Sequence, residues 1–169
     1  MNTEFVYFSD KLLSKDIGAI SQNMVKPFWS EGKWNMHDLL TFLLKTTGPA
    51  KVWLSTFSIS EASIRAFNNA MDEGLITELN CLFDYTIKKN KLQLLVFASN
   101  VASDIRLTPN HSKIILIEND NWNLTVVGSA NMTPNPRKEA GVILTDRNSY
   151  LHFKERLVQA MLDGVEIDI

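Results

Sequence analysis

The chain has 169 residues, of which 45% are hydrophobic and 21% are charged, a balance typical of one globular domain rather than of a disordered chain. Seventeen Lys and Arg residues against nineteen Asp and Glu residues give a formal charge of −2, so no overall positive field is available to hold nucleic acid and any polyanion site must be a local patch. Cys81 is the one cysteine, which excludes an intrachain disulfide and favours a reducing compartment.

The start of the chain carries no targeting signal that we recognise. Its first ten residues lack a basic start and an apolar run, unlike a signal peptide. The longest apolar stretches, such as Leu92–Ala98 and Ile114–Ile117, fall far short of the ~20 residues that span a bilayer. We therefore expect a cytoplasmic protein without stable membrane association.

The first 33 residues have a weak pattern and are interpreted as an N-terminal extension of one domain that covers residues 1–169. Phe5, Phe8, Leu12 and Leu13 have roughly helical spacing. We expect this extension to pack on the domain, and the pattern does not define its role.

Helices and strands alternate from residue 35 to residue 107. Asn35 is placed to cap one helix, which Gly48-Pro49 ends, and Ser60 begins another, which Gly74 ends. Runs of β-branched and aromatic residues between the helices predict strands. The expected elements are a helix over Met36–Thr46, a strand over Val52–Phe57, a helix over Glu61–Met71, a strand over Leu75–Phe83, a helix over Lys88–Val101 and a short strand over Ile105–Leu107.

The second half of the chain predicts a hairpin, a strand and a final helix. The hairpin strands are Lys113–Ile117 and Leu124–Val127, joined by the polar turn 118–123. A strand over Gly141–Leu144 follows, and then a helix that Asn148 or Ser149 caps and that runs through Leu162 to Gly164. Early alternation with a late hairpin indicates an α/β sandwich in which a mixed β-sheet is flanked by helices.

Four polar side chains gather around this hairpin. His111 and Lys113 precede or begin one strand and share a face because strand side chains alternate, while Ser129 and Asn131 share a face where the other strand ends. A hairpin brings these two ends together. An imidazole, an ammonium, a hydroxyl and a carboxamide around one spot suit an anion with several oxygens, such as a phosphodiester. Of these four kinds of group, the imidazole is the one whose unperturbed pKa lies near neutrality, so His111 is the candidate nucleophile or proton carrier.

These residues resemble a known signature. His111-x-Lys113 followed by Gly128-Ser129-x-Asn131 is similar to the HKD motif of the phospholipase D superfamily, and the stretch GSANMTPNPRKE, which ends at Glu139, resembles the downstream part of that motif. The match covers residues 111–139. It implies a phospholipase D-like sandwich and a phosphodiesterase that needs neither metal nor cofactor.

The resemblance also implies a mechanism and an assembly. The family's reaction uses two histidines, one of which forms a phosphohistidine while the other protonates the leaving oxygen and later activates water. Because the chain carries one motif, it resembles the small members that pair as homodimers. His111 would then be the nucleophile in one copy and the general acid and base in the other, with Lys113 and Asn131 holding phosphate oxygens, Ser129 hydrogen bonding nearby and Glu139 orienting His111.

The sequence departs from the family's motif in two places. Glu118 stands where the motif has an aspartate, and the gap to Gly128 is longer than usual. By strand alternation residue 118 faces away from His111, so we expect a structural role for its carboxylate. Asp120 is an alternative substitute for the missing aspartate.

Among substrates of the implied activity, nucleic acid, either DNA or RNA, is our first expectation and phospholipid the second. The alternative from another class is a module that has lost turnover and only holds nucleic acid or a partner protein. Trp122, in the hairpin turn, is the best candidate for stacking on a base, ahead of Trp34, and Trp53 is expected in the core. The basic run Lys88, Lys89 and Lys91 is interpreted as a solvated helix start, with backbone contacts to a polyanion as the alternative.

The remaining reactive side chains have ordinary structural interpretations. His37, at a helix start, and His152, on the last helix, are expected to be structural, and Cys81 to be a small buried hydrophobe. Three scattered histidines and one cysteine lack the spacing of a zinc site.

Overall fold

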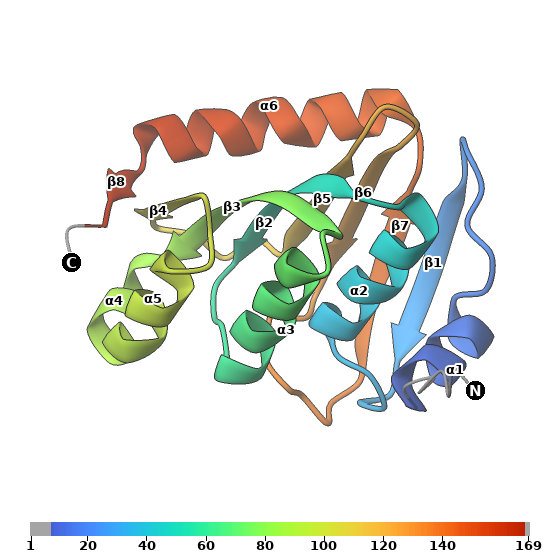
Figure 1. Ribbon diagram of the computed structural model, residues 1–169, viewed down its shortest axis with the longest axis horizontal. Helices are drawn as coiled ribbons and strands as arrows, with labels where there is room; N and C mark the ends of the chain where they lie inside the picture. Colours follow the sequence, from blue (N-terminus) through green and yellow to red (C-terminus); the bar gives the residue numbers. More distant parts are fainter. Residues whose placement is uncertain (1–7, 168–169) are drawn as a thin grey trace.

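The computed structural model describes residues 8–167, which fold around one eight-stranded sheet (Figure 1). The strand order is β1-β7-β6-β5-β2-β3-β4-β8. The helices are α1 (Phe8–Asp16), α2 (Met36–Thr47), α3 (Glu61–Asp72), α4 (Tyr85–Asn90), α5 (Leu92–Ser99) and α6 (Arg147–Asp163), and the strands are β1 (Val25–Ser30), β2 (Ala50–Thr56), β3 (Ile76–Asp84), β4 (Asp104–Thr108), β5 (Ile114–Glu118), β6 (Asn123–Gly128), β7 (Glu139–Leu144) and β8 (Val165–Glu166).

The sheet is mixed, as predicted. β2, β3 and β4 run parallel, and helices connect them across one face of the sheet. β5, β6 and β7 form an antiparallel meander, in which Ile114 pairs with Val127 and Glu118 with Asn123. Because β5 lies antiparallel to β2, the C-terminal end of β2, the start of β5 and the end of β6 meet at one edge. The predicted fold class is therefore confirmed.

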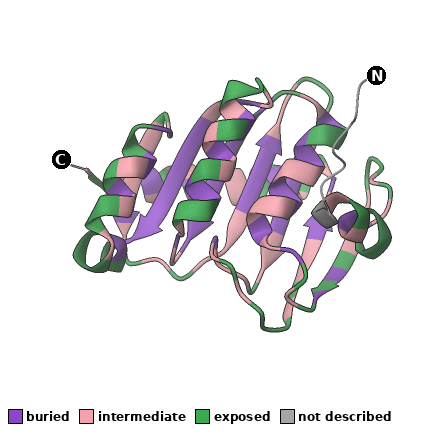
Figure 2. Ribbon diagram, turned by 60° about the horizontal axis from the view of Figure 1, so that its bottom comes forward, coloured by how far each residue is buried: buried purple, intermediate pink, exposed green. Residues whose placement is uncertain are grey.

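Two apolar layers sandwich the sheet, with α6 on one face and α1 to α5 on the other (Figures 1 and 2). Neighbouring strand residues alternate between the layers: Ile115 and Ile117 face α2 and α3, whereas Leu116 faces α6. The α6 layer is small and is built from Trp53, Leu82, Leu116, Tyr150, Leu157 and Met161. In Figure 2 the strands behind the helices are mostly buried.

The segment before residue 34 completes both the sheet and one helical layer. The roughly helical spacing noted there falls on α1, which buries Leu13 and Ile17 in the larger core, while Phe5 lies outside the described residues. The structure adds a strand that the sequence pattern did not predict, since β1 pairs antiparallel with β7 from Val25↔Leu144 to Ser30↔Glu139. Pro27 has no N–H for a ladder, which an edge strand tolerates.

Two of the four predicted helix starts, those of α2 and α3, are confirmed, because their caps are local. Asn35 and Asp38 form a capping box at α2, and the Ser60 hydroxyl accepts a hydrogen bond from the Ser63 N–H at α3. The last helix is present, but its predicted cap at Asn148 or Ser149 is wrong: the cap is Asp146, whose Oδ1 accepts a hydrogen bond from the Ser149 N–H at 2.8 Å. The predicted stop at Gly164 is confirmed.

The long helix predicted over residues 88–101 is wrong in detail. It is two short helices, α4 and α5, with a non-helical backbone at Lys91 between them. The Lys91 ammonium donates to Ser58 Oγ and to the carbonyl of Ile59, both at 2.8 Å. These long-range hydrogen bonds of Lys91 accompany the break between the two helices, and no local sequence signal predicts the break.

Candidate active site

The predicted site residues lie where three antiparallel strands and β2 converge on one edge of the sheet. His111 and Lys113 precede β5, Ser129 and Asn131 follow β6, and Glu139 begins β7. The loop between β6 and β7 passes at the bottom of Figure 1, in orange. The predicted strand over Lys113–Ile117 in fact begins at Ile114, so both His111 and Lys113 belong to the connection that enters β5.

The side chains of His111 and Lys113 touch. Lys113 Nζ lies 2.7 Å from the carbonyl oxygen of His111 and 3.2 Å from His111 Nδ1. Because a lysine ammonium has donors and no acceptor, this hydrogen bond requires an unprotonated Nδ1 and places the ring proton on Nε2. The His111 imidazole is exposed and lies against Phe57, with ring centroids 5.0 Å apart.

Burial lowers the pKa of Lys113 below its usual value, and the nearby charge of Glu139 opposes that shift. None of the ion pairs within residues 8–167 includes Lys113. Its backbone carbonyl accepts a hydrogen bond from the Gly128 N–H at 3.2 Å, which joins the two halves of the motif. The site therefore holds a partly desolvated cation that a phosphate can neutralise.

Ser129 and Glu139 form a second pair on neighbouring strand ends. The Ser129 hydroxyl donates to Glu139 Oε2 and accepts from the Ala140 N–H at 3.1 Å. The Asn135 amide donates to the other carboxylate oxygen of Glu139. Among the described residues Glu139 hydrogen bonds with these two side chains and not with His111, so the predicted orienting contact is absent from the single chain.

Asn131 is held by the end of β2. Its Oδ1 accepts from the Phe57 N–H at 3.2 Å and from Thr56 Oγ1 at 3.3 Å. The Nδ2 group is then outside any hydrogen bond within the part of the chain that the structure describes. A carboxamide fixed through its oxygen offers its two N–H donors to a ligand.

Glu118 has the structural role expected for it. Its carboxylate lies at the opposite end of β5 from Lys113 and accepts from Tyr150 Oη at 2.9 Å and from Lys154 Nζ at 2.6 Å. Burial alone would raise the pKa of Glu118, but these hydrogen bonds outweigh it and the net pKa is lowered. Asp120 is exposed in the turn, and the carboxylate that contacts α6 is that of Glu118.

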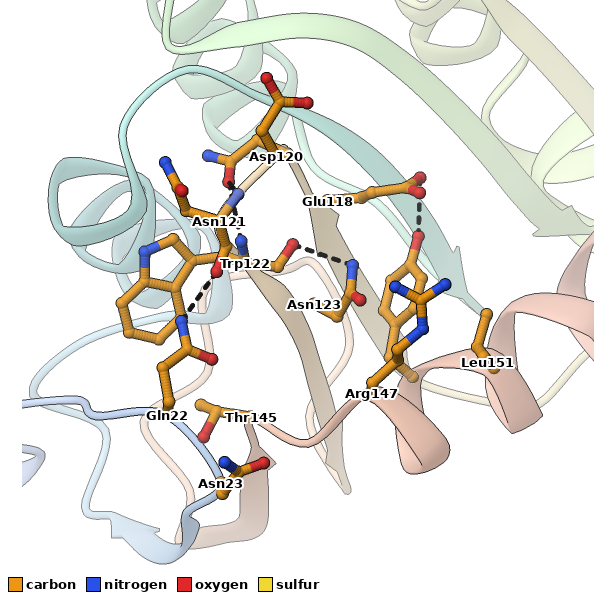
Figure 3. Close-up of a pocket in the computed structure, with 12 residues that line it drawn as sticks. Gln22, Asn23, Glu118, Asp120, Asn121, Trp122, Asn123, Thr145, Arg147 and Leu151 are labelled. Atoms are coloured by element: carbon orange, nitrogen blue, oxygen red, sulfur yellow. Dashed lines mark hydrogen bonds between the residues drawn. The ribbon is translucent and has the colours of Figure 1, made fainter.

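The tryptophan expectations are correct in part. Trp53 is in the core as expected, and Trp34 is buried as well, with its indole N–H bonded to Asp16. Trp122 is half-buried beside a hollow of about 400 Å³ at the far end of β5 (Figure 3), so it cannot stack on a base that lies at His111. Trp29 is 57% exposed on β1 and was overlooked because that strand was not predicted.

Several other expectations concern residues outside the site. Lys88 and Lys89 are exposed on α4, as a solvated face requires, whereas Lys91 is tied into the fold. His37 is largely buried against Ser63, and burial lowers its pKa. His152 is exposed on α6 and contacts Phe153. Cys81 is buried as expected, which raises its thiol pKa.

Two residues that hold the site in place, Phe57 and Asn110, were not predicted from the sequence. Phe57 packs against His111, and Asn110 bonds to residues of β2 and β3. Asn110 adjoins the motif, which was the available signal, but its partners are far away in the chain.

Comparisons with known proteins identify the fold. No protein-family model matches the chain, and a search of curated proteins finds none that matches. Nuc from Salmonella typhimurium, described as a phospholipase D family member, superposes with a TM-score of 0.64 over 86% of this chain and 99% of Nuc, at 16% identity. NucT from Helicobacter pylori gives a TM-score of 0.64 over 85% of this chain and 100% of NucT, at 20% identity.

A third structure with a similar fold belongs to a protein that is described by its DNA binding. TrmBL2, an archaeal chromatin protein, matches with a TM-score of 0.59 over 93% of this chain and 58% of its own, at 12% identity. Likenesses at these identities establish architecture. The chain has the fold of the phospholipase D family, as the resemblance in its motif predicted.

Residues 8–167 contain neither a candidate membrane span nor a candidate metal cluster. No helix there is both long and apolar enough to cross a bilayer. No three or more His, Cys, Asp or Glu side chains there are grouped so as to hold a metal ion.

Proposed function

We propose that the chain is a metal-independent phosphodiesterase that cleaves nucleic acid, with a phosphohistidine intermediate at a site shared by two copies. The observation that carries this proposal is that His111, Lys113 and Asn131 all lie around Phe57 at one end of the sheet. The Phe57 ring contacts the His111 ring and lies 6.0 Å from Lys113 Nζ, and the Phe57 N–H donates to Asn131 Oδ1. The fold common to this chain and Nuc supports it.

Phosphate binding would reorganise Lys113. In the free chain its ammonium donates to His111 Nδ1, and a phosphate oxygen is a stronger, charged acceptor. Transfer of Lys113 to the phosphate frees Nδ1 to take the ring proton, so Nε2 becomes the unprotonated, nucleophilic nitrogen. Asn131 Nδ2 supplies further donors, and Glu139 helps to keep the Lys113 amine charged.

The chemistry then runs in two displacements. Nε2 of His111 in one copy attacks phosphorus, an N–P bond forms, the P–O bond to the leaving group breaks, and the leaving oxygen takes a proton from His111 of the second copy. That second imidazole next removes a proton from water, whose oxygen attacks phosphorus as the N–P bond breaks. Lys113 and Asn131 from both copies neutralise the charge that develops on the phosphate oxygens.

The homodimer is part of this proposal because a single chain offers one imidazole at the site. His37 and His152 are on α2 and α6, and neither belongs to the site edge. Two-fold pairing is the commonest symmetry of soluble assemblies. We accordingly expect light scattering of the purified protein to give the molar mass of a dimer, and a monomer would leave the mechanism one histidine short.

DNA or RNA is the proposed substrate class, in the cytoplasm. A similar fold occurs in TrmBL2, a chromatin protein described by its DNA binding, which favours nucleic acid as the partner, and the free, buried Cys81 suits a reducing compartment. Phospholipid is the competing ester. The formal charge of −2 predicts modest affinity that depends on local contacts.

One observation favours a second candidate, a binding module without turnover. Glu139 bonds to Ser129 and Asn135 rather than to His111, so within residues 8–167 the imidazole has no carboxylate partner of the kind that catalytic triads use. In this alternative the same edge holds a nucleic-acid backbone or a partner protein and no bond is cleaved.

The experiment that separates these functions measures cleavage in the presence of chelator. Purified protein is incubated with single- and double-stranded DNA, RNA, bis(p-nitrophenyl) phosphate and phosphatidylcholine vesicles. Chelator-resistant cleavage of nucleic acid, abolished by His111→Ala, is the expected result. Binding without cleavage supports the module, cleavage of phosphatidylcholine alone overturns the substrate class, and a requirement for added metal overturns the mechanism.

A further inference from the structure

We infer that Asn110 is a positioning residue that holds the His111 imidazole at the phosphate site, an inference that rests on the proposed function. Asn110 itself does not face the reacting atoms. It acts through the backbone on both sides of His111, which it ties to the ends of β2 and β3.

The need for such a residue comes from the topology. β4 lies beside β3, whereas β5 lies on the far side of β2, so the chain between them crosses beneath the C-terminal ends of β3 and β2. This crossing, residues 109–113, has no strand or helix of its own. Backbone groups at both strand ends, and in the crossing itself, need partners other than a regular ladder.

The Asn110 carboxamide supplies those partners in both directions. Its Nδ2 donates to Ser55 Oγ at 2.9 Å and lies 3.2 Å from the carbonyl of Leu82. Its Oδ1 accepts from the Ser112 N–H at 3.0 Å and from the Ser112 hydroxyl at 2.7 Å. One side chain thus joins β2, β3 and the residue that follows His111.

The backbone of Asn110 is anchored as well. Its N–H donates to Asp84 Oδ2 at 2.9 Å, while Asp84 Oδ1 accepts from the N–H and the hydroxyl of Thr86 at the start of α4. Asp84 is 8% exposed. Burial would raise the pKa of this carboxyl, yet the donors around it lower it overall, so it remains a charged acceptor.

His111 is therefore fixed by its neighbours more than by its own side chain. The imidazole is exposed, with a ring contact to Phe57 and a hydrogen bond to the ammonium of Lys113. Residues 110 and 112 are both held to β2, since the Ser55 and Ser112 hydroxyls also lie 2.5 Å apart. Displacement of a catalytic group by about 1 Å can cost about 10²-fold in rate.

The test compares two asparagines with similar hydrogen bonds at opposite ends of β5. Asn119 donates through Nδ2 to the carbonyls of Thr47 and Pro49, and its Oδ1 accepts from two N–H groups of the hairpin turn. With bis(p-nitrophenyl) phosphate as substrate, Asn110→Ala is expected to lower kcat by about 10²-fold with KM changed less than about threefold. Asn119→Ala is expected to keep kcat within about twofold.

A milder variant keeps the test decisive if Asn110→Ala does not fold. Asn110→Asp retains the acceptor for Ser112 and the backbone bond to Asp84, and it loses the donors to β2 and β3. We expect a loss of kcat of about tenfold, between the wild type and Asn110→Ala. Wild-type kcat in either Asn110 variant, or equal losses in the Asn110 and Asn119 variants, would overturn the inference.

A second readout does not need catalysis, so it separates this inference from the proposed function. The Phe57 ring lies close enough to shift the Cε1–Hε1 NMR signal of His111, and Phe57→Leu gives the unshifted reference. In Asn110→Ala and Asn110→Asp the signal should move toward that reference. If wild-type protein cleaves no phosphodiester the proposed function fails, whereas an unmoved signal in both Asn110 variants means that Asn110 does not position His111.

Discussion

The two ends of β5 carry the same kinds of side chain in different states. At the end near Glu118, Lys154 lies 2.6 Å from a carboxylate and 3.5 Å from the centre of the Trp53 ring. At the end near His111, Lys113 is bonded to an imidazole and a carbonyl, and burial lowers its pKa. Both ends have a lysine, a glutamate and a bridging asparagine.

The polar groups at the Glu118 end hydrogen bond to one another and stabilise the fold, whereas those at the His111 end keep donors available for a ligand. Glu118, Tyr150 and Lys154 hydrogen bond to one another beside the small core beneath α6, and Figure 3 shows Glu118 at this end of the sheet. Lys113 and the amide of Asn131 keep donors available at the other end. A site that binds an anion must leave such donors unsatisfied, at some cost in stability.

The largest expected effect on the rate comes from replacing His111, and replacing the second exposed histidine, His152, is the control. His111→Ala should lower phosphodiester cleavage by about 10⁴-fold or more because it removes the nucleophile and the proton carrier together. His152→Ala, on α6, should change the rate by less than about twofold. A His152 variant as inactive as the His111 variant would contradict this account of the two regions.

Substitution of Lys113 should affect the rate of cleavage, whereas substitution of Lys154 should affect the stability of the fold. Lys113→Met should lower kcat by about 10²–10³-fold while leaving the melting temperature unchanged or higher, because a desolvated charge is removed. Lys154→Met should leave the rate unchanged and lower the free energy of unfolding by about 1–2 kcal/mol, because Glu118 loses a charged donor. Steady-state kinetics and denaturant unfolding on both variants measure the pair of effects.

The alkaline side of the pH–rate profile should report Lys113. Activity that needs the charged amine falls as pH rises through its pKa, which burial places below the usual 10.5. Glu139 raises that pKa, so Glu139→Gln should move the alkaline fall in kcat/KM to lower pH. An unchanged or upward-shifted profile would argue against a charged Lys113 in the reaction.

The stability of the protein at acid pH should report the state of Glu118, at the other end of β5. The pKa of Glu118 is lowered in the fold from 4.5, so its contribution to stability is complete above that value and is lost as pH falls through the lower, folded pKa. The difference in unfolding free energy between wild type and Glu118→Gln should therefore shrink between about pH 6 and about pH 3. A difference that is constant over this range would mean that the carboxylate is not stabilised by Tyr150 and Lys154.

Local signals in the sequence predicted much of the fold. The caps at Asn35 and Ser60 and the polar turn of the hairpin depend on neighbours within a few residues, and they are correct. β1 was missed because it forms by pairing with β7, more than 100 residues away. The break between α4 and α5 accompanies a bond from Lys91 to the loop after β2, which is equally invisible in a local pattern.

The candidate site divides in the same way. His111, Lys113, Ser129 and Asn131 could be named because a motif holds them at fixed spacing. Asn110 and Phe57 could not, since their roles depend on the order of β3, β2 and β5 in the sheet. Trp122 was misjudged because an exposed turn was predicted without knowledge of which end of the sheet would carry the site.

The most direct test of the central claim mixes wild-type protein with His111→Ala after both have been unfolded together and refolded at equal amounts. If each active site needs His111 from two copies, random pairing leaves about one quarter of the dimers competent, so cleavage should be about one quarter of that of wild type at the same total protein concentration. Activity of about one half would show that each chain acts with its own histidine alone, and the shared site would be wrong.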